Sequence, residues 1–276
     1  MVQAAAPARA DRVPVLMYHR VEPVLAASER RYAVSTAQFA AQLDWLAAHG
    51  WQPCTLAAFM AWYLDGAALP PRSVLISFDD GFAGLHAQVL PQLARRGWPA
   101  TVFLVSALIG GREGWLAREQ QASGAAHALL SAAQIAEMAA AGIEFHSHSR
   151  HHARLTELDD ERLADELAGS RAELQQLLGT AVEAIAYPYG GVDDRVRQAA
   201  ARAGYRLGFS VEPGFNRAAG PALAVRRLDI TGFDTPARFG RKLNLGTNDG
   251  SLAYQLRYVG RRLAARLRPH AAGGTP

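Results

Sequence analysis

The chain has 276 residues, of which 50% are hydrophobic and 20% are charged, with a formal net charge of +4. This length allows one large domain or two small ones, and α/β barrels of about 250 residues form a single unit. The hydrophobic content excludes a disordered chain. The single cysteine, Cys54, excludes a disulfide framework and a cysteine-based zinc site, so any metal has to be bound by histidine and carboxylate.

The positive charge is concentrated near the C-terminus, which argues against nucleic acid as a partner. Five arginines lie in the last twenty residues: Arg257, Arg261, Arg262, Arg266 and Arg268. The rest of the chain is close to neutral and gives no broad basic surface. The sequence has no run of 18 apolar residues, so we predict no membrane span. Residues 1–12, which we expect to be disordered, lack the apolar region of a secretory signal. These features predict a cytoplasmic protein.

A β/α unit recurs between residues 13 and 234. Helical runs rich in Ala and Leu end at Gly50, Gly97, Gly142, Gly179 and Gly204, where a left-handed residue is expected. Short apolar runs follow at 51–55, 98–105, 143–147, 180–188 and 205–210, and they are continuous, as in strands buried on both faces. With 13–18 and 73–78 they give about seven strands. The pattern favours a single-domain α/β barrel of about seven units, with an open doubly wound sheet as the alternative.

Two segments depart from this rhythm. Residues 106–130 form a long insertion with no strong period, which is typical of a substrate-binding or lid element. Residues 235–276 are assigned to an amphipathic helix and a flexible tail, with apolar residues at helical spacing: Leu252, Leu256, Val259, Leu263 and Leu267. This basic helix either packs on the barrel with its arginines in solvent, or docks on an anionic membrane surface or an acidic partner.

Polar clusters directly follow four of the predicted strands. They are Tyr18-His19, Asp79-Asp80-Gly81, His146-Ser147-His148 and Pro188-Tyr189-Gly190. The carboxyl ends of parallel barrel strands meet on one face, where the active sites of such folds lie. The sequence therefore predicts that these clusters converge on one pocket.

The residue types in this pocket point to a metal site. Two adjacent acids after a buried strand are costly unless they bind a cation or take different roles. His148 and His152 are four residues apart, the spacing that places two imidazoles on one side of a helical turn. One Asp and two His leave open positions for water and substrate, as catalytic metal sites do. We expect a divalent metal, with zinc as the default and iron, cobalt or nickel as alternatives.

Three motifs resemble those of the polysaccharide deacetylase family, the NodB-homology carbohydrate esterases of family 4. They are SFDDGF at 77–82, SHSRHHARL at 147–155 and AYPYGG at 186–191. The stretch VPVLMYHRV at 13–21 is also similar to the subgroup of bacterial exopolysaccharide N-deacetylases. The resemblance covers roughly residues 13–230 and implies a distorted barrel of about seven β/α units.

The resemblance also implies roles for individual residues. Asp79 matches the general base, and Asp80, His148 and His152 match the metal ligands. On this reading Asp79 takes a proton from a water that the metal has acidified. The backbone N–H of Tyr189 would help to bind the oxyanion, with Pro188 and Gly190 fixing the turn.

The sequence departs from the usual family pattern in two places. The family's late Leu-x-His motif is missing, because residues 223–232 contain no histidine, and His19 is our candidate for the general acid. The Arg of the third motif, which orients the catalytic Asp in the family, is Ala186 here. Arg227 in the late strand could take its place. Arg226 is the weaker choice, because neighbouring strand residues point to opposite faces.

The leading hypothesis is a metal-dependent hydrolase that removes N-acetyl groups from amino sugars of a polysaccharide or glycan precursor. Trp115, in the long insertion, is the candidate for stacking on a sugar ring. One alternative is a barrel that binds glycan with little turnover, because two family motifs are incomplete. The other is a deacetylase of a small amide or an O-acetyl ester.

Overall fold

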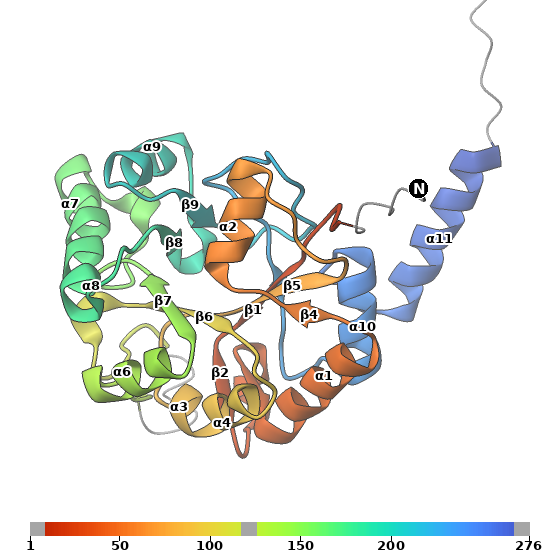
Figure 1. The fold of residues 1–276 in the computed structure, drawn as a ribbon, viewed down its shortest axis with the longest axis horizontal. Helices are drawn as coiled ribbons and strands as arrows, with labels where there is room; N and C mark the ends of the chain where they lie inside the picture. The colour runs from red at the N-terminus through yellow and green to blue at the C-terminus, as the bar shows by residue number, and fades with distance from the viewer. Residues whose placement is uncertain (1–8, 117–125, 268–276) are drawn as a thin grey trace, which may run out of the picture.

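The computed structural model describes residues 9–116 and 126–267, with side chains to residue 259. At its centre, parallel strands are hydrogen-bonded in the order β10-β1-β5-β6-β7-β8-β9. Their bounds are β1 Val15–Tyr18, β5 Ser73–Phe78, β6 Ala100–Leu104, β7 Ile143–Ser147, β8 Ala184–Ala186, β9 Leu207–Phe209 and β10 Leu228–Asp229. Helices surround the strands (Figure 1). The predicted distorted (β/α)7 barrel is confirmed.

Two strands differ from the sequence prediction. The run at 51–55 forms only β4 (Gln52–Pro53), which pairs with β5 beside the main path of the sheet. Pro53 has no N–H to donate, which shortens the possible ladder. The remaining place in the path belongs to β10, which pairs with β1. The segment before β10 hydrogen-bonds to β9 through Val225 and Gly208, N to O 2.8 Å, so backbone pairing continues from β9 round to β1.

The strands are buried on both faces, which explains their continuous apolar sequences. Neighbouring residues of one strand belong to different core clusters: Leu16 and Ile76 lie in one, whereas Val15 and Leu75 lie in the other. This is the period-two alternation of a β-strand with an apolar layer on each side. The first cluster includes residues of the outer helices, and the second includes Phe103 and other residues of the opposite strand faces.

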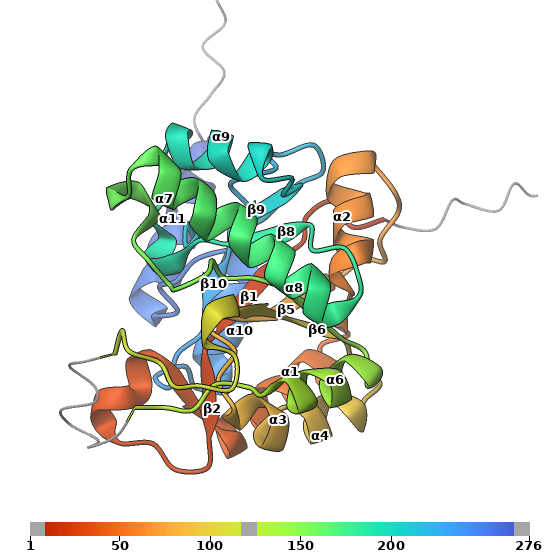
Figure 2. The ribbon, with the colours of Figure 1, turned by 90° about the vertical axis from the view of Figure 1, so that its left-hand side faces the viewer.

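Most of the helices begin at a polar side chain that caps the first turn. Their bounds are α1 Thr36–Ala48, α2 Leu56–Asp65, α3 Gly84–Gln88, α4 Leu90–Ala94, α6 Ala132–Ala140, α7 Asp160–Ala164, α8 Ser170–Leu178, α9 Asp194–Arg202, α10 Pro236–Leu245 and α11 Leu252–Leu267. Ser35 accepts a hydrogen bond from Gln38 N at the start of α1, and Ser131 and Gln134 form a capping box on α6. The glycines predicted to end helical runs all have positive φ. Figure 2 shows α8 and α9 on one side of the strands and α1, α3, α4 and α6 on the other.

The terminal regions add contacts that the sequence did not predict. Helix α10 lies in the range assigned to a terminal helix and tail, but its Phe239 is fully buried and meets the Trp45 ring edge-on at 5.6 Å. Residues 1–8 of the expected disordered N-terminus lie outside the described residues. Ala10, which follows them, donates to Leu69 O at 2.9 Å and accepts from Trp62 Nε1 at 3.3 Å.

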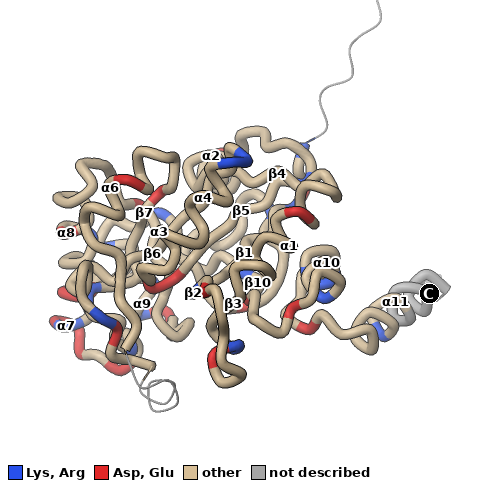
Figure 3. The backbone as a smooth tube through the Cα atoms, turned by 90° about the horizontal axis from the view of Figure 1, so that it is seen from below, with Lys and Arg blue, Asp and Glu red and all other residues tan. Residues whose placement is uncertain are grey.

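The sequence analysis offered two possibilities for helix α11, and the first of them, packing on the barrel, is wrong. The helix extends away from the body of the molecule in both Figure 1 and Figure 3. Its Leu252 and Leu256 side chains are 63% and 73% exposed. Among the described residues, no helix combines the length and apolar content needed to cross a membrane.

Candidate metal and catalytic site

A cavity of about 460 Å3 opens where β1, β5 and β7 end. The structure brings most of the predicted site residues to its wall: His19, Asp79, Asp80, Trp115, His148, His152 and Tyr189. Pro188 and Gly190 flank Tyr189, and Arg227 lies behind Asp79. Residues separated by up to 170 positions therefore converge as the strand-end argument predicts.

The turn after β5 presents the two acids. Asp79 N donates to Tyr18 O at 2.9 Å, so the backbone pairing of β1 and β5 extends to this residue. Asp80 and Gly81 then adopt φ of 73° and 74°, and the chain turns sharply. A Cβ at Gly81 would lie 2.6 Å from Leu104 Cδ2, so glycine is required there. For Asp80 the left-handed backbone costs about 1–3 kcal/mol, a strain that typically marks functional sites.

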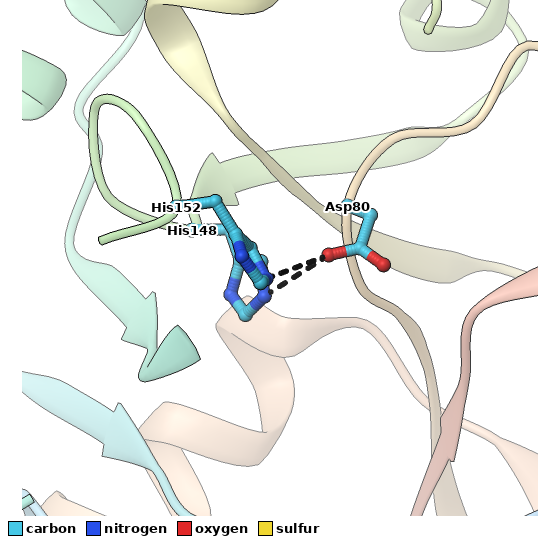
Figure 4. A group of neighbouring side chains, drawn as sticks. All are labelled: Asp80, His148 and His152. Atoms are coloured by element: carbon cyan, nitrogen blue, oxygen red, sulfur yellow. Dashed lines mark ion pairs between the residues drawn. The ribbon is translucent and has the colours of Figure 1, made fainter. Parts of the chain in front are cut away.

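Asp80, His148 and His152 form one buried cluster (Figure 4). Asp80 Oδ1 lies 3.3 Å from His148 Nε2 and 3.2 Å from His152 Nε2. The Nδ1–H of His148 donates to Ala186 O at 2.8 Å, because a carbonyl can only accept, and this bond leaves the Nε2 lone pair facing Asp80. All three side chains therefore direct ligand atoms at one point.

The local backbone of the two histidines differs from the prediction. They do not share a helical turn, because residues 148–152 form a loop after β7 in which Ser149 and His152 have φ of 63° and 60°. The loop is fixed by Ser149 Oγ, which accepts from His152 N at 3.1 Å, and by His148 N, which donates to Leu104 O at 2.7 Å. A tight loop thus brings the imidazoles together at a spacing that a helix can also provide.

The cluster fits a divalent transition metal. Ligand bonds of about 2.0–2.1 Å in a tetrahedral site place neighbouring ligand atoms about 3.3–3.4 Å apart, close to the Asp80–histidine separations. Asp80 Oδ1 is buried with no hydrogen-bond partner, which is costly for a carboxylate unless a cation balances it. Two imidazoles and one carboxylate suit zinc, iron, cobalt or nickel better than magnesium or calcium.

Arg227 holds Asp79 through two hydrogen bonds. Arg227 Nη1 and Nη2 donate to Asp79 Oδ1 and Oδ2 at 2.6 and 2.8 Å, and Arg227 Nε donates to Ser210 O at 2.9 Å. Both side chains are buried. Burial alone would raise the pKa of Asp79, but the positive charge of Arg227 and its two hydrogen bonds outweigh it, so the pKa of Asp79 lies below its usual value. Arg226 instead reaches Pro213 O near the surface.

Asp80 is also held in its ionised form. Burial raises its pKa, but the facing imidazoles of His148 and His152 outweigh that effect and hold the pKa well below the ordinary range. Both adjacent carboxylates are therefore negative at neutral pH. Arg227 balances one of these charges, and a cation in the cluster would balance the other.

The pairing of Arg227 with Asp79 leads to a stability prediction. Replacing Arg227 by Met leaves the Asp79 carboxylate buried without its partner, and we expect the free energy of unfolding to fall by about 3–5 kcal/mol. The matched control is Arg226→Met, whose exposed side chain should change it by less than about 1 kcal/mol. Urea unfolding of both variants measures the difference. Equal stability of the two would contradict the structural role of the pair.

Tyr189 and Trp115 line the cavity around His152. Tyr189 lies in the short helix η5 (Pro188–Gly190) with φ of 57°, and its half-exposed ring meets the His152 ring edge-on at 4.6 Å. A Cβ at Gly190 would lie 2.3 Å from Val211 Cγ2, so this turn requires glycine. The Trp115 ring stacks on the His152 ring, with the two ring centroids 4.1 Å apart. The two aromatic residues restrict how His152 can move.

His19 reaches the same cavity from the end of β1. Its ring meets that of Tyr32 edge-on at 5.7 Å, and its Nδ1 is buried with no hydrogen-bond partner. A ring nitrogen without a hydrogen-bond partner can hold or give up a proton without breaking an existing hydrogen bond. Its placement suits a group that donates a proton to substrate.

Sequence reasoning missed several residues of the cavity wall. They are Met17, Arg31, Tyr32, Leu116, Arg154, Tyr187, Val211, Asp229 and Asn248. Asp229 could have been found, because it lies two residues after Arg227 and therefore on the same strand face. Arg31, which forms an ion pair with Asp229 at 2.5 Å, lies at the end of η1 (Ala27–Arg31), where no strand-end signal marks it.

The fold and site define a class: a distorted (β/α)7 barrel with an Asp-His-His cluster and an arginine-paired aspartate at the carboxyl ends of its strands. Within that class the chain belongs to the polysaccharide deacetylase family, whose family model matches residues 66–208. The match includes the Asp79-Asp80 turn and both histidines of the cluster.

Individual relatives agree with this assignment. The chain is 28% identical over 203 residues to the Bacillus subtilis protein YxkH, which is named for the same family, covering 74% of this chain and 66% of that protein. It is 28% identical over 192 residues to a Staphylococcus aureus poly-β-1,6-N-acetyl-D-glucosamine N-deacetylase, covering 66% and 62%. The chain thus spans less than two thirds of the length of these curated relatives. The structure of IcaB from Ammonifex degensii is similar, with a TM-score of 0.68 and 27% identity over 82% of this chain and 94% of that one.

Proposed function

We propose that the protein is a metal-dependent N-deacetylase that hydrolyses the acetamido group of N-acetylglucosamine residues in a glycan. The observation that carries this proposal is the arrangement of two adjacent buried aspartates with different partners. Asp80 faces two imidazole nitrogens, whereas Asp79 is held by an arginine and stays outside the metal cluster. One acid is thereby available as a ligand and the other as a base.

Each of these residues has a different role in hydrolysis of the amide bond. A divalent metal held by Asp80, His148 and His152 would supply Lewis acidity that polarises the acetyl carbonyl and lowers the pKa of a water. Asp79, ionised and oriented by Arg227, accepts the proton of the attacking water. His19, at the end of β1, gives a proton to the amine as the C–N bond breaks, so that acetate and a free amine are released.

The cavity wall supports binding of a sugar next to the acetamido group. The Tyr189 backbone N–H is the candidate donor to the developing oxyanion, because the strained turn of Pro188 and Gly190 fixes its position. Trp115 and Tyr189 offer aromatic surface beside the cluster, which suits a pyranose ring. The relative from Staphylococcus aureus, named for poly-β-1,6-N-acetyl-D-glucosamine, makes β-1,6-linked N-acetylglucosamine the first substrate to test.

An assay of acetate and free amine with β-1,6-linked N-acetylglucosamine oligomers tests the proposal. We expect both products in equal amounts, because one amide bond yields one of each. β-1,4-Linked oligomers of the same length serve as the comparison for linkage. Acetate release from O-acetyl esters or small amides alone would contradict the substrate class, and tight oligomer binding with no acetate would instead indicate a glycan-binding barrel.

A further inference from the structure

Helix α11 presents an exposed apolar face outside the barrel. Leu252, Leu256 and Val259 are 63%, 73% and 45% exposed, and they are separated by four and three residues, so they lie on one side of the helix. Figures 1 and 3 show the helix extending away from the strands and from α10. The protein's own core therefore does not cover this face.

The sequence continues the same pattern to the end of the helix. In the sequence, Leu263 and Leu267 follow Val259 at intervals of four, and the 16-residue helix is about 24 Å long. The helix contains Arg257, Arg261, Arg262 and Arg266 and no acidic residue. Arg257 Nη2 lies 3.8 Å from Oδ2 of Asp249, a residue just before the helix. At this exposed position and distance, Asp249 stabilises the charge of Arg257 only weakly.

We propose that α11 docks this protein on an anionic membrane surface. The leucine face would lie at the boundary of the acyl chains, with the helix axis in the plane of the interface and the arginines at the level of the lipid headgroups. Leucine together with arginine, without aspartate or glutamate, is the composition of interfacial helices. The long arginine side chains let apolar stems follow the leucines while the guanidinium groups reach the phosphates.

Charge favours a membrane over a second copy of this chain. Two α11 helices paired through their leucines would bring arginines of both copies close together, with no carboxylate within the helices to pair with them. An acidic protein partner would satisfy the charges, but would need its own apolar groove for the leucines. A bilayer with anionic lipids supplies both the apolar layer and the negative charge.

Sedimentation with lipid vesicles tests this proposal. We expect the full chain to bind vesicles that contain phosphatidylglycerol, to bind pure phosphatidylcholine vesicles weakly, and to be released progressively by salt. Leu256→Glu should weaken vesicle binding on the order of tenfold or more, because it puts a charge on the apolar face. The matched control is Leu177→Glu, at a leucine of α8 that is 40% exposed, and it should bind like the unaltered chain.

Folding and self-association are measured alongside. Circular dichroism and thermal unfolding should be the same for Leu256→Glu and Leu177→Glu, so that a loss of binding reflects the helix face. No binding of the unaltered chain to anionic vesicles would overturn the proposal, as would equal binding by Leu256→Glu. A dimer in solution that Leu256→Glu converts to a monomer, without vesicle binding, would assign this face to a second copy instead.

Discussion

Replacing Asp79 with asparagine is expected to lower kcat/KM for acetate release by about 10²–10⁴-fold. The amide has nearly the shape of the carboxylate but cannot accept the proton of the attacking water. The Asp80, His148 and His152 cluster does not include this side chain, so metal content should stay at the level of the unaltered protein. Initial rates of acetate release and metal analysis of the same preparation give both quantities.

A control separates this effect from loss of folding. The Asp79→Asn substitution would leave Arg227 buried without a carboxylate, so the variant should be less stable but still folded at assay temperature. Asp44→Asn changes an exposed aspartate that pairs with Arg96 at the surface, and it should keep full activity. If Asp79→Asn binds metal, stays folded and releases acetate at the normal rate, Asp79 is not the base.

Replacing His152 with alanine is expected to remove metal binding and activity together. Loss of an outer-shell partner of a metal ligand already costs about 10–100-fold in affinity, and loss of one of three protein ligands should cost more. Competition with a chelator measures the affinity, and acetate release measures the activity. Added metal in excess should restore part of the activity, which distinguishes weak binding from a misfolded site.

His151 provides a control at the adjacent position. Its side chain is 51% exposed, and its Nδ1 lies 2.7 Å from Glu166 Oε1, outside the cavity wall. His151→Ala should therefore keep its metal and its activity. Equal loss of metal in the His151 and His152 variants would show that the loop, and not the particular imidazole, is what matters.

The strands and the convergence of the site could be predicted because they depend on local patterns. Buried parallel strands are apolar throughout, as in 73–78 and 98–105, and a glycine marks the end of each preceding helix. The polar residues after those strands had to meet, because parallel strands end on one face. Because neighbouring strand residues point to opposite faces, Arg227 was the better candidate to contact Asp79. In the structure Arg227 contacts Asp79 and Arg226 does not.

Other features depend on contacts that leave little mark in the sequence. Helix α10 is held by Phe239, which packs on Trp45. This long-range contact was not predicted, because the β/α pattern ends after residue 235. The loop of His148 and His152 needs left-handed residues that are not glycine, which sequence patterns do not indicate. Arg31 and Tyr32 reach the cavity from a segment outside the main sheet, and only the tertiary fold brings them there.

Metal dependence of the deacetylation is tested with protein that is stripped by a chelator and then given back one equivalent of zinc, iron, cobalt or nickel. The assay measures acetate release from β-1,6-linked N-acetylglucosamine oligomers. We expect the stripped protein to be inactive and at least one of these metals to restore release of acetate and amine in equal amounts. One equivalent of metal should not restore the His152→Ala protein. Full activity of the stripped protein would contradict metal dependence.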